Sequence, residues 1–111
     1  MQEILEFVKT EVPTNWHERD IKERLVYWSR PDASLTEPRR TICALEVWCE
    51  FYGRSRRDFS QATARRINIE LSKLTDYHRS SSLDCGPYGR QRGFARQVLP
   101  RNWTRIASAN T

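Results

Sequence analysis

The side chains with the clearest chemical potential are ten cations, grouped in three adjacent stretches of the second half of the chain. Nine of them are arginine, whose planar guanidinium group fits phosphate oxygens and base edges better than the compact charge of lysine. Each one alone is more often a solvated surface charge than a ligand, but their grouping favours a binding surface for a polyanion. The ten are Arg54, Arg56, Arg57, Arg65, Arg66, Lys73, Arg79, Arg90, Arg92 and Arg96.

The charge balance of the two halves agrees with this grouping. Residues 1–53 carry 7 Lys and Arg against 10 Asp and Glu, whereas residues 54–111 carry 12 against 4, and the net charge is +5. Sixteen of the 19 cations are arginine. A basic half of this kind predicts a polyanionic partner, most simply nucleic acid. Composition alone equally allows a solvated, arginine-rich surface.

The cysteines and histidines do not form a recognisable metal site. The three cysteines, Cys43, Cys49 and Cys85, are an odd number without C-x-x-C spacing, and His17 and His78 are remote in sequence. A zinc site would therefore need an unusual ligand arrangement. We expect buried, reduced cysteines.

Catalytic motifs are missing from the sequence. It contains no phosphate-binding loop, no dinucleotide-binding fingerprint and no H-E-x-x-H. Glu46 and Glu50 have i, i+4 spacing, but we expect them on the solvated side of a helix, and Ser80, Ser81 and Ser82 suggest loop polarity. The chain is therefore predicted to be no enzyme, with no cofactor and no metal.

The chain length of 111 residues predicts one domain, residues 1–111. This length excludes a two-domain enzyme with an interdomain cleft. No apolar run is long enough to span a bilayer, and the N-terminus has acids where a signal peptide needs a basic and an apolar block. We expect a soluble, cytoplasmic domain without a membrane partner.

Two amphipathic helices are predicted in the acidic N-terminal part. Residues 1–11 place apolar side chains at helical spacing, and Pro13 ends the pattern. Residues 17–29 follow, where Asp20 and Glu23 have the spacing of a capping box. The apolar stripe of this second helix is predicted to be Ile21, Leu25 and Trp28.

The third predicted helix covers residues 36–53 and forms the core. Thr36 is its expected N-cap, Pro38 lies in the first turn, and Gly53 follows the last periodic residue. The fourth covers residues 60–75, with Ser60 as its cap. Its predicted buried face is Ala64, Ile67, Leu71 and Leu74. Its opposite face is Gln61, Arg65, Arg66, Ile69, Ser72 and Lys73.

The pattern changes after residue 76 and predicts a β-hairpin. A short polar strand is followed by a turn with Gly86, Pro87 and Gly89, and by a basic second strand. The order of elements predicts a mainly α fold with a C-terminal β-hairpin, winged helix-turn-helix-like. Its second helix would enter a DNA major groove while the hairpin contacts the backbone. The expected parts are N-terminal helices and connector (1–36), a winged-helix-like unit (37–98) and a C-terminal tail (99–111).

Several segments resemble one protein family. They are ICALEVWCE at 42–50, the Ala64 to Leu74 helix, YGRQRGFAR at 88–96 and VPTNWHERDIKER at 12–24. In order and spacing they are similar to the C-terminal region of virulence-associated E family proteins, over most of residues 5–97. These are phage- and mobile-element-encoded replication proteins of the primase–helicase type.

The resemblance implies a DNA-engaging module attached to an upstream, ATP-driven helicase core, which would be its partner. The family's catalytic residues lie upstream, so none is carried over. We expect binding to DNA, to duplex more than to single strands. The alternative is a docking module that contacts the helicase core or a neighbouring subunit through the acidic helices, Ile69, Trp16 and Trp103. A third possibility is a stand-alone regulator encoded on a mobile element.

Overall fold

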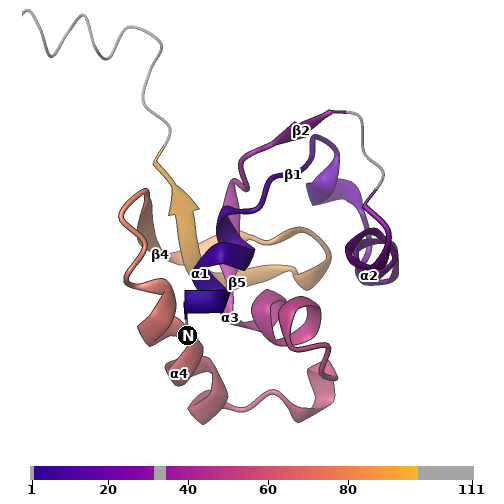
Figure 1. The fold of residues 1–111 in the computed structure, drawn as a ribbon. Helices are drawn as coiled ribbons and strands as arrows, with labels where there is room; N and C mark the ends of the chain where they lie inside the picture. Colours follow the sequence, from indigo (N-terminus) through magenta and orange to yellow (C-terminus); the bar gives the residue numbers. More distant parts are fainter. Residues whose placement is uncertain (1, 32–34, 98–111) are drawn as a thin grey trace, which may run out of the picture.

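The core lies where three helical segments pack against a three-stranded sheet (Figure 1). The computed structural model describes residues 2–31 and 35–97. Its buried core combines side chains of α1 (Gln2–Lys9), the helical segment at 44–51, α4 (Gln61–Leu71) with the turn after it, and the sheet. These side chains are Ile4, Val8, Ile42, Ala44, Val47, Ile67, Leu71, Leu74 and Phe94. The predicted tail at 99–111 lies outside the described residues.

The two N-terminal helices are close to their predicted places. Helix α1 is Gln2–Lys9 and α2 is Ile21–Ser29. The predicted capping box starts α2, because the Glu23 N–H donates to Asp20 Oδ1 (2.7 Å) and the Asp20 N–H donates to Glu23 Oε1 (3.2 Å). Helix α2 begins later than predicted because Trp16–Glu18 forms a separate 3₁₀ turn.

The predicted third helix is wrong over its first half. Thr36–Glu37 is a strand, β2, paired with β1 at Val12–Pro13, so Thr36 is no helix cap. Thr41–Cys43 is another strand, β3. Pairing with distant segments overrides the helical preference of these residues.

The helix proper begins at α3, Ala44–Glu46, and continues directly as a π-helical turn, Val47–Phe51. Such turns are rare. In this one the Tyr52 N–H donates to the Val47 carbonyl at 3.1 Å. Gly53 ends the segment as predicted, with φ +66°.

Helix α4, Gln61–Leu71, begins at the predicted cap, where the Thr63 N–H donates to Ser60 Oγ at 3.1 Å. The helix ends at Leu71, four residues before the predicted end. Ile67 is buried in the core, as predicted. Ile69 points outward with 61% exposure, also as predicted.

The predicted hairpin is formed by β4, Tyr77–Asp84, and β5, Arg90–Arg96, which pair antiparallel. Strand β3 pairs with the other edge of β5, giving the order β3-β5-β4. Gly93 is required at this crossing, since an added Cβ would lie 2.4 Å from the Ile42 carbonyl oxygen.

The predicted fold class, mainly α and winged helix-turn-helix-like, is wrong. Strands make up 24% of the described residues and helices 48%, so the fold is mixed α/β with two antiparallel sheets. The strands β1, β2 and β3 were not predicted, because two or three residues are too few to show the alternation of apolar and polar residues that is typical of a strand. Within the described part of the chain, no helix has the length and hydropathy to cross a membrane.

Candidate nucleic-acid interface

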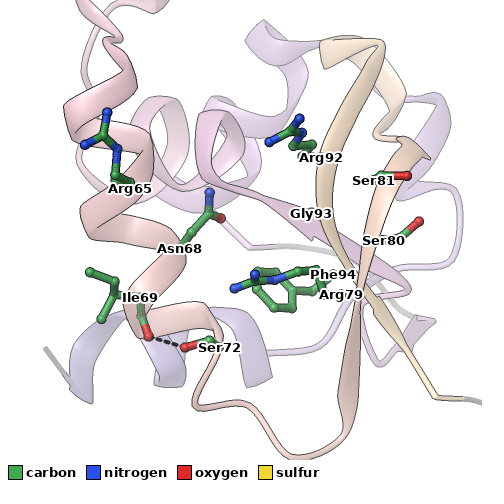
Figure 2. Close-up of a pocket in the computed structure, with 10 residues that line it drawn as sticks. All are labelled: Arg65, Asn68, Ile69, Ser72, Arg79, Ser80, Ser81, Arg92, Gly93 and Phe94. Atoms are coloured by element: carbon green, nitrogen blue, oxygen red, sulfur yellow. Dashed lines mark hydrogen bonds between the residues drawn. The ribbon is translucent and has the colours of Figure 1, made fainter.

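A groove of about 380 Å³ separates α4 from the β4–β5 hairpin (Figure 2). Arginines from three elements line it: Arg65 from α4, Arg79 from β4 and Arg92 from β5. All three side chains are exposed. Tertiary structure thus brings together three cations that lie up to 27 positions apart in the sequence.

The electrostatics of the groove are one-sided. Among the described residues that line it, none is acidic. Within the described ranges, 2–31 and 35–97, Arg65, Arg79 and Arg92 form no ion pair. The Arg79 guanidinium carbon lies 5.7 Å from the ring centroid of Phe94, which steadies this side chain by a cation–π contact. The three charges are therefore free to meet an anionic ligand.

Groups suited to base edges lie beside these charges. Asn68 points from α4 toward the sheet (Figure 2), and its buried Oδ1 has no hydrogen-bond partner among the described residues. The groove continues along α4 into a second hollow of about 480 Å³, where Gln61 adds a further amide and Gln91 lies with its Nε2 donating to the Tyr88 carbonyl at 3.0 Å. Side-chain amides donate and accept hydrogen bonds, as recognition of base edges requires.

Three of the ten predicted cations lie away from the groove lining. Lys73 Nζ is 3.1 Å from Glu70 Oε1, in an ion pair. Arg90 stands opposite Asp84 at one end of the hairpin, and Arg96 opposite Tyr77 at the other. The i, i+3 spacing of Glu70 and Lys73 is a sequence signal that could have identified this ion pair.

The other four predicted cations lie outside this groove lining as well. Arg54 and Arg66 line a different hollow, together with Trp48 and Tyr52. The remaining two, Arg56 and Arg57, are exposed in a 3₁₀ turn before α4. Consecutive helical residues point about 100° apart, so Arg66 leaves α4 on a different flank from Arg65 and lines this other hollow.

Sequence reasoning missed a buried charge cluster on another side of the core. Arg24 Nη1 lies 3.0 Å from Glu46 Oε2 and 3.1 Å from Glu50 Oε2. Arg39 also pairs with Glu46. The prediction that Glu46 and Glu50 are solvated is therefore wrong. The cause is packing, because α2 and the segment before β3 cover this side of the helix.

The cluster is closed to ligands. Burial raises the pKa of Glu46 to about 7, although the guanidinium group of Arg39 acts to lower it. Glu50 accepts hydrogen bonds from Trp28 Nε1 (2.8 Å) and from the Tyr88 hydroxyl (2.7 Å). These contacts hold the N-terminal segment against the core. We therefore assign the cluster a structural role and no role in ligand binding.

The predicted stripe of α2 also needs correction. Arg24 and Tyr27 are the buried residues of this helix, whereas Leu25 is exposed. Trp16, predicted as a docking residue, is buried and packs edge-on against Tyr27 (5.4 Å) and Trp28 (5.3 Å). The Arg24–Tyr27–Trp28 spacing is the signal that could have identified this face. Trp103 lies outside the described residues.

The cysteines are buried and free, as predicted. In the described part of the chain, no group of three His, Cys, Asp or Glu residues is placed to hold a metal ion. His17 Nε2 lies 3.3 Å from Asp84 Oδ1. The pKa of the Asp84 carboxyl group is lowered, chiefly by the hydrogen bond that it accepts from the Gly86 N–H and next by the electrostatic effect of His17.

No protein-family model matches the chain, and no curated protein matches it either. The resemblance to the virulence-associated E family stays a prediction.

Proposed function

We propose that this chain binds duplex DNA, with α4 against the major groove and the hairpin arginines on phosphates. The observation that carries the proposal is the meeting of Arg65, Arg79 and Arg92 on one groove whose lining contains no acidic residue. Guanidinium groups bind phosphate oxygens in a bidentate way, and phosphate contacts dominate affinity for DNA.

Helix α4 presents side chains that can read base edges in the major groove. The major groove of DNA admits an α-helix, and its base edges are read by amide, guanidinium and apolar groups. Helix α4 offers Gln61, Arg65 and Asn68 along the groove, and Ile69 is 61% exposed beside them. An exposed isoleucine suits contact with a thymine methyl group.

The groove favours duplex over single strands. Single-stranded nucleic acid binds chiefly by stacking its bases on aromatic rings. The one ring among the described residues that line the groove, Phe94, is only 4% exposed, so a base has no open face there. A module of this kind would serve a replication protein with an upstream helicase core, as the family resemblance implies.

The test is a salt titration of duplex binding, followed by fluorescence anisotropy of a labelled 20-base-pair duplex. For the wild-type chain we expect log K to fall linearly with log salt between about 50 and 300 mM. The Arg65→Gln, Arg79→Gln, Arg92→Gln variant loses the two phosphate contacts of the hairpin arginines, so its slope should be less negative by about 1.8. With the base contact of Arg65 lost as well, its binding should be at least tenfold weaker.

A matched variant removes three charges elsewhere: Lys9→Gln, Lys22→Gln, Arg30→Gln. It has the same net charge as the groove variant, and its substituted side chains are exposed away from the groove lining. We expect its affinity to stay within about threefold of wild type. Equal losses in the two variants, or no wild-type binding at 50 mM salt, would overturn the proposal.

A further inference from the structure

A third hollow, of about 350 Å³, lies on a different flank of α4 from the proposed duplex groove. We call it the aromatic hollow and define it by Trp48, Tyr52, Arg54 and Arg66. Buried side chains of α1 and α4 contribute to its lining. Three segments therefore build it: the start of the chain, the π-helical turn with the loop after it, and the outer flank of α4.

The aromatic part of this hollow is held in place by its own loop. Trp48 Nε1 donates a hydrogen bond to the Ser55 carbonyl at 2.8 Å, and the Arg54 N–H donates to the Trp48 carbonyl at 3.0 Å. The Tyr52 ring packs edge-on against Phe51, with centroids 5.0 Å apart at 76°. Tyr52 nevertheless remains 41% exposed. A fixed ring with open surface is a stacking platform.

The charge of this hollow is also one-sided. Arg54 and Arg66 are both exposed, and neither forms an ion pair within the described ranges. Among the described residues that line the hollow, none is acidic. Proteins that bind single-stranded nucleic acid combine cations with an aromatic ring. The phosphates contact the cations, and an unpaired base stacks on the ring. The two guanidinium groups and the tyrosine ring of this hollow form the same combination.

We propose that the aromatic hollow binds a single-stranded segment of nucleic acid, with a base on Tyr52 and phosphates on Arg54 and Arg66. This inference rests on the proposed duplex site, which it extends to a duplex carrying a single-stranded overhang. A base within a duplex has both faces stacked, so the ring distinguishes the overhang from the duplex.

The two sites are close enough for one ligand. Arg65 lines the duplex groove and Arg66, the next residue of α4, lines the aromatic hollow. An α-helix with its side chains is about 10–12 Å across. A strand advances about 3.4 Å per nucleotide. An overhang of about four nucleotides is therefore long enough to cross the width of α4 from one site to the other. An overhang of six nucleotides exceeds this minimum length.

The experiment compares four labelled probes by anisotropy. They are a blunt 16-base-pair duplex, the same duplex with a six-nucleotide thymine overhang at the 5′ end, the same duplex with that overhang at the 3′ end, and a thymine 12-mer. For wild type we expect one overhang duplex to bind at least fivefold more tightly than the blunt duplex. Tyr52→Leu should abolish that preference and leave blunt-duplex affinity within twofold. Tyr52→Phe should retain the preference, because the ring remains.

A second pair of variants tests the charge. Arg66→Gln should reduce the overhang preference at least threefold, whereas Arg30→Gln, an exposed arginine outside the described lining of both sites, should leave it unchanged. Equal binding of blunt and overhang duplexes by wild type would overturn the inference. Tyr52→Leu lowering both affinities equally would overturn it as well.

The outcomes separate the two proposals. If the blunt duplex does not bind at 50 mM salt, the duplex proposal fails, and Tyr52-dependent binding of the thymine 12-mer would still support the aromatic hollow. No 12-mer binding in that case would overturn both. Tyr52-dependent binding of a tyrosine-phosphorylated peptide, without any overhang preference, would assign the hollow to a protein partner and overturn this inference.

Discussion

Nη1 of Arg24 lies 3.0 Å from Oε2 of Glu46, and these two residues of α2 and α3 are 1% and 2% exposed. They are 22 residues apart in sequence. Their contact fixes the N-terminal segment to the helix that leads into the proposed binding elements. A buried ion pair gives little net stability as a whole, but the loss of one partner leaves a buried charge unpaired. Without Arg24, Glu46 would keep Arg39, whereas buried Glu50 would have no ion-pair partner among the described residues.

Arg24→Met should lower the free energy of unfolding by about 3–5 kcal/mol, because it removes one member of a buried, multiply bonded ion pair. Urea unfolding followed by tryptophan fluorescence measures the change. Arg30→Met is the control, since Arg30 is exposed at the end of the same helix and its replacement should cost less than about 0.5 kcal/mol. Equal effects of the two variants would show that the cluster adds no stability.

The pH dependence of stability tests the protonation of Glu46. Burial raises its pKa to about 7 from 4.5, so the folded chain binds more protons than the unfolded chain between these values. The free energy of unfolding should therefore fall as pH rises from about 4.5 to about 7, by at most about 1.4 kcal/mol per pH unit. Urea midpoints at several pH values, compared with those of Glu46→Gln, isolate this contribution. The same pH slope in both proteins would contradict the prediction.

Replacement of Arg65 and replacement of Lys73 should differ in their effect on duplex binding. Arg65 lies within α4, and Lys73 lies just after its end. Lys73 is engaged with Glu70 at 3.1 Å, whereas Arg65 lines the groove without an ion-pair partner in the described residues. We expect Arg65→Gln to weaken duplex binding at least fivefold, about 1 kcal/mol, and Lys73→Gln to change it less than twofold. Anisotropy at one low salt concentration is sufficient. A larger loss for Lys73→Gln would move the binding surface to the end of α4.

Gly93→Ala should destabilise the sheet. An added Cβ would lie 2.4 Å from the Ile42 carbonyl oxygen of the neighbouring strand and 3.2 Å from the Cys43 Cβ, so β3 and β5 would have to separate. We expect a loss of about 1–3 kcal/mol, measured by thermal unfolding. Ser81→Ala, at an exposed position of the same hairpin, should stay within about 0.5 kcal/mol of wild type. Unchanged stability of Gly93→Ala would mean that the strands tolerate a wider spacing.

Features governed by near neighbours in the chain could be predicted from the sequence. The Asp20–Glu23 capping box, the Ser60 cap and the end of a helix at Gly53 all follow from residues within one or two turns. The β4–β5 hairpin and the exposure of Ile69 belong to the same class. Each depends on local hydrogen bonds or on periodicity over several residues.

Features that depend on distant partners could not be predicted. The strand at Thr41–Cys43 exists because β5, some fifty residues later, pairs with it. Glu46 and Glu50 have the spacing of a solvated face and are nevertheless buried, because Arg24 and Arg39 from two other segments neutralise them. No local pattern contains that information.

The sequence by itself determined that the second half of the chain is basic, rich in arginine and divided among a turn, a helix and a hairpin. Only the tertiary structure decided which arginines share a surface. Arg65, Arg79 and Arg92 meet because the sheet packs beside one flank of α4, whereas Arg66 leaves a different flank toward Tyr52. The physical reason is that charge is a property of each residue, while a binding surface is a property of the packing between elements.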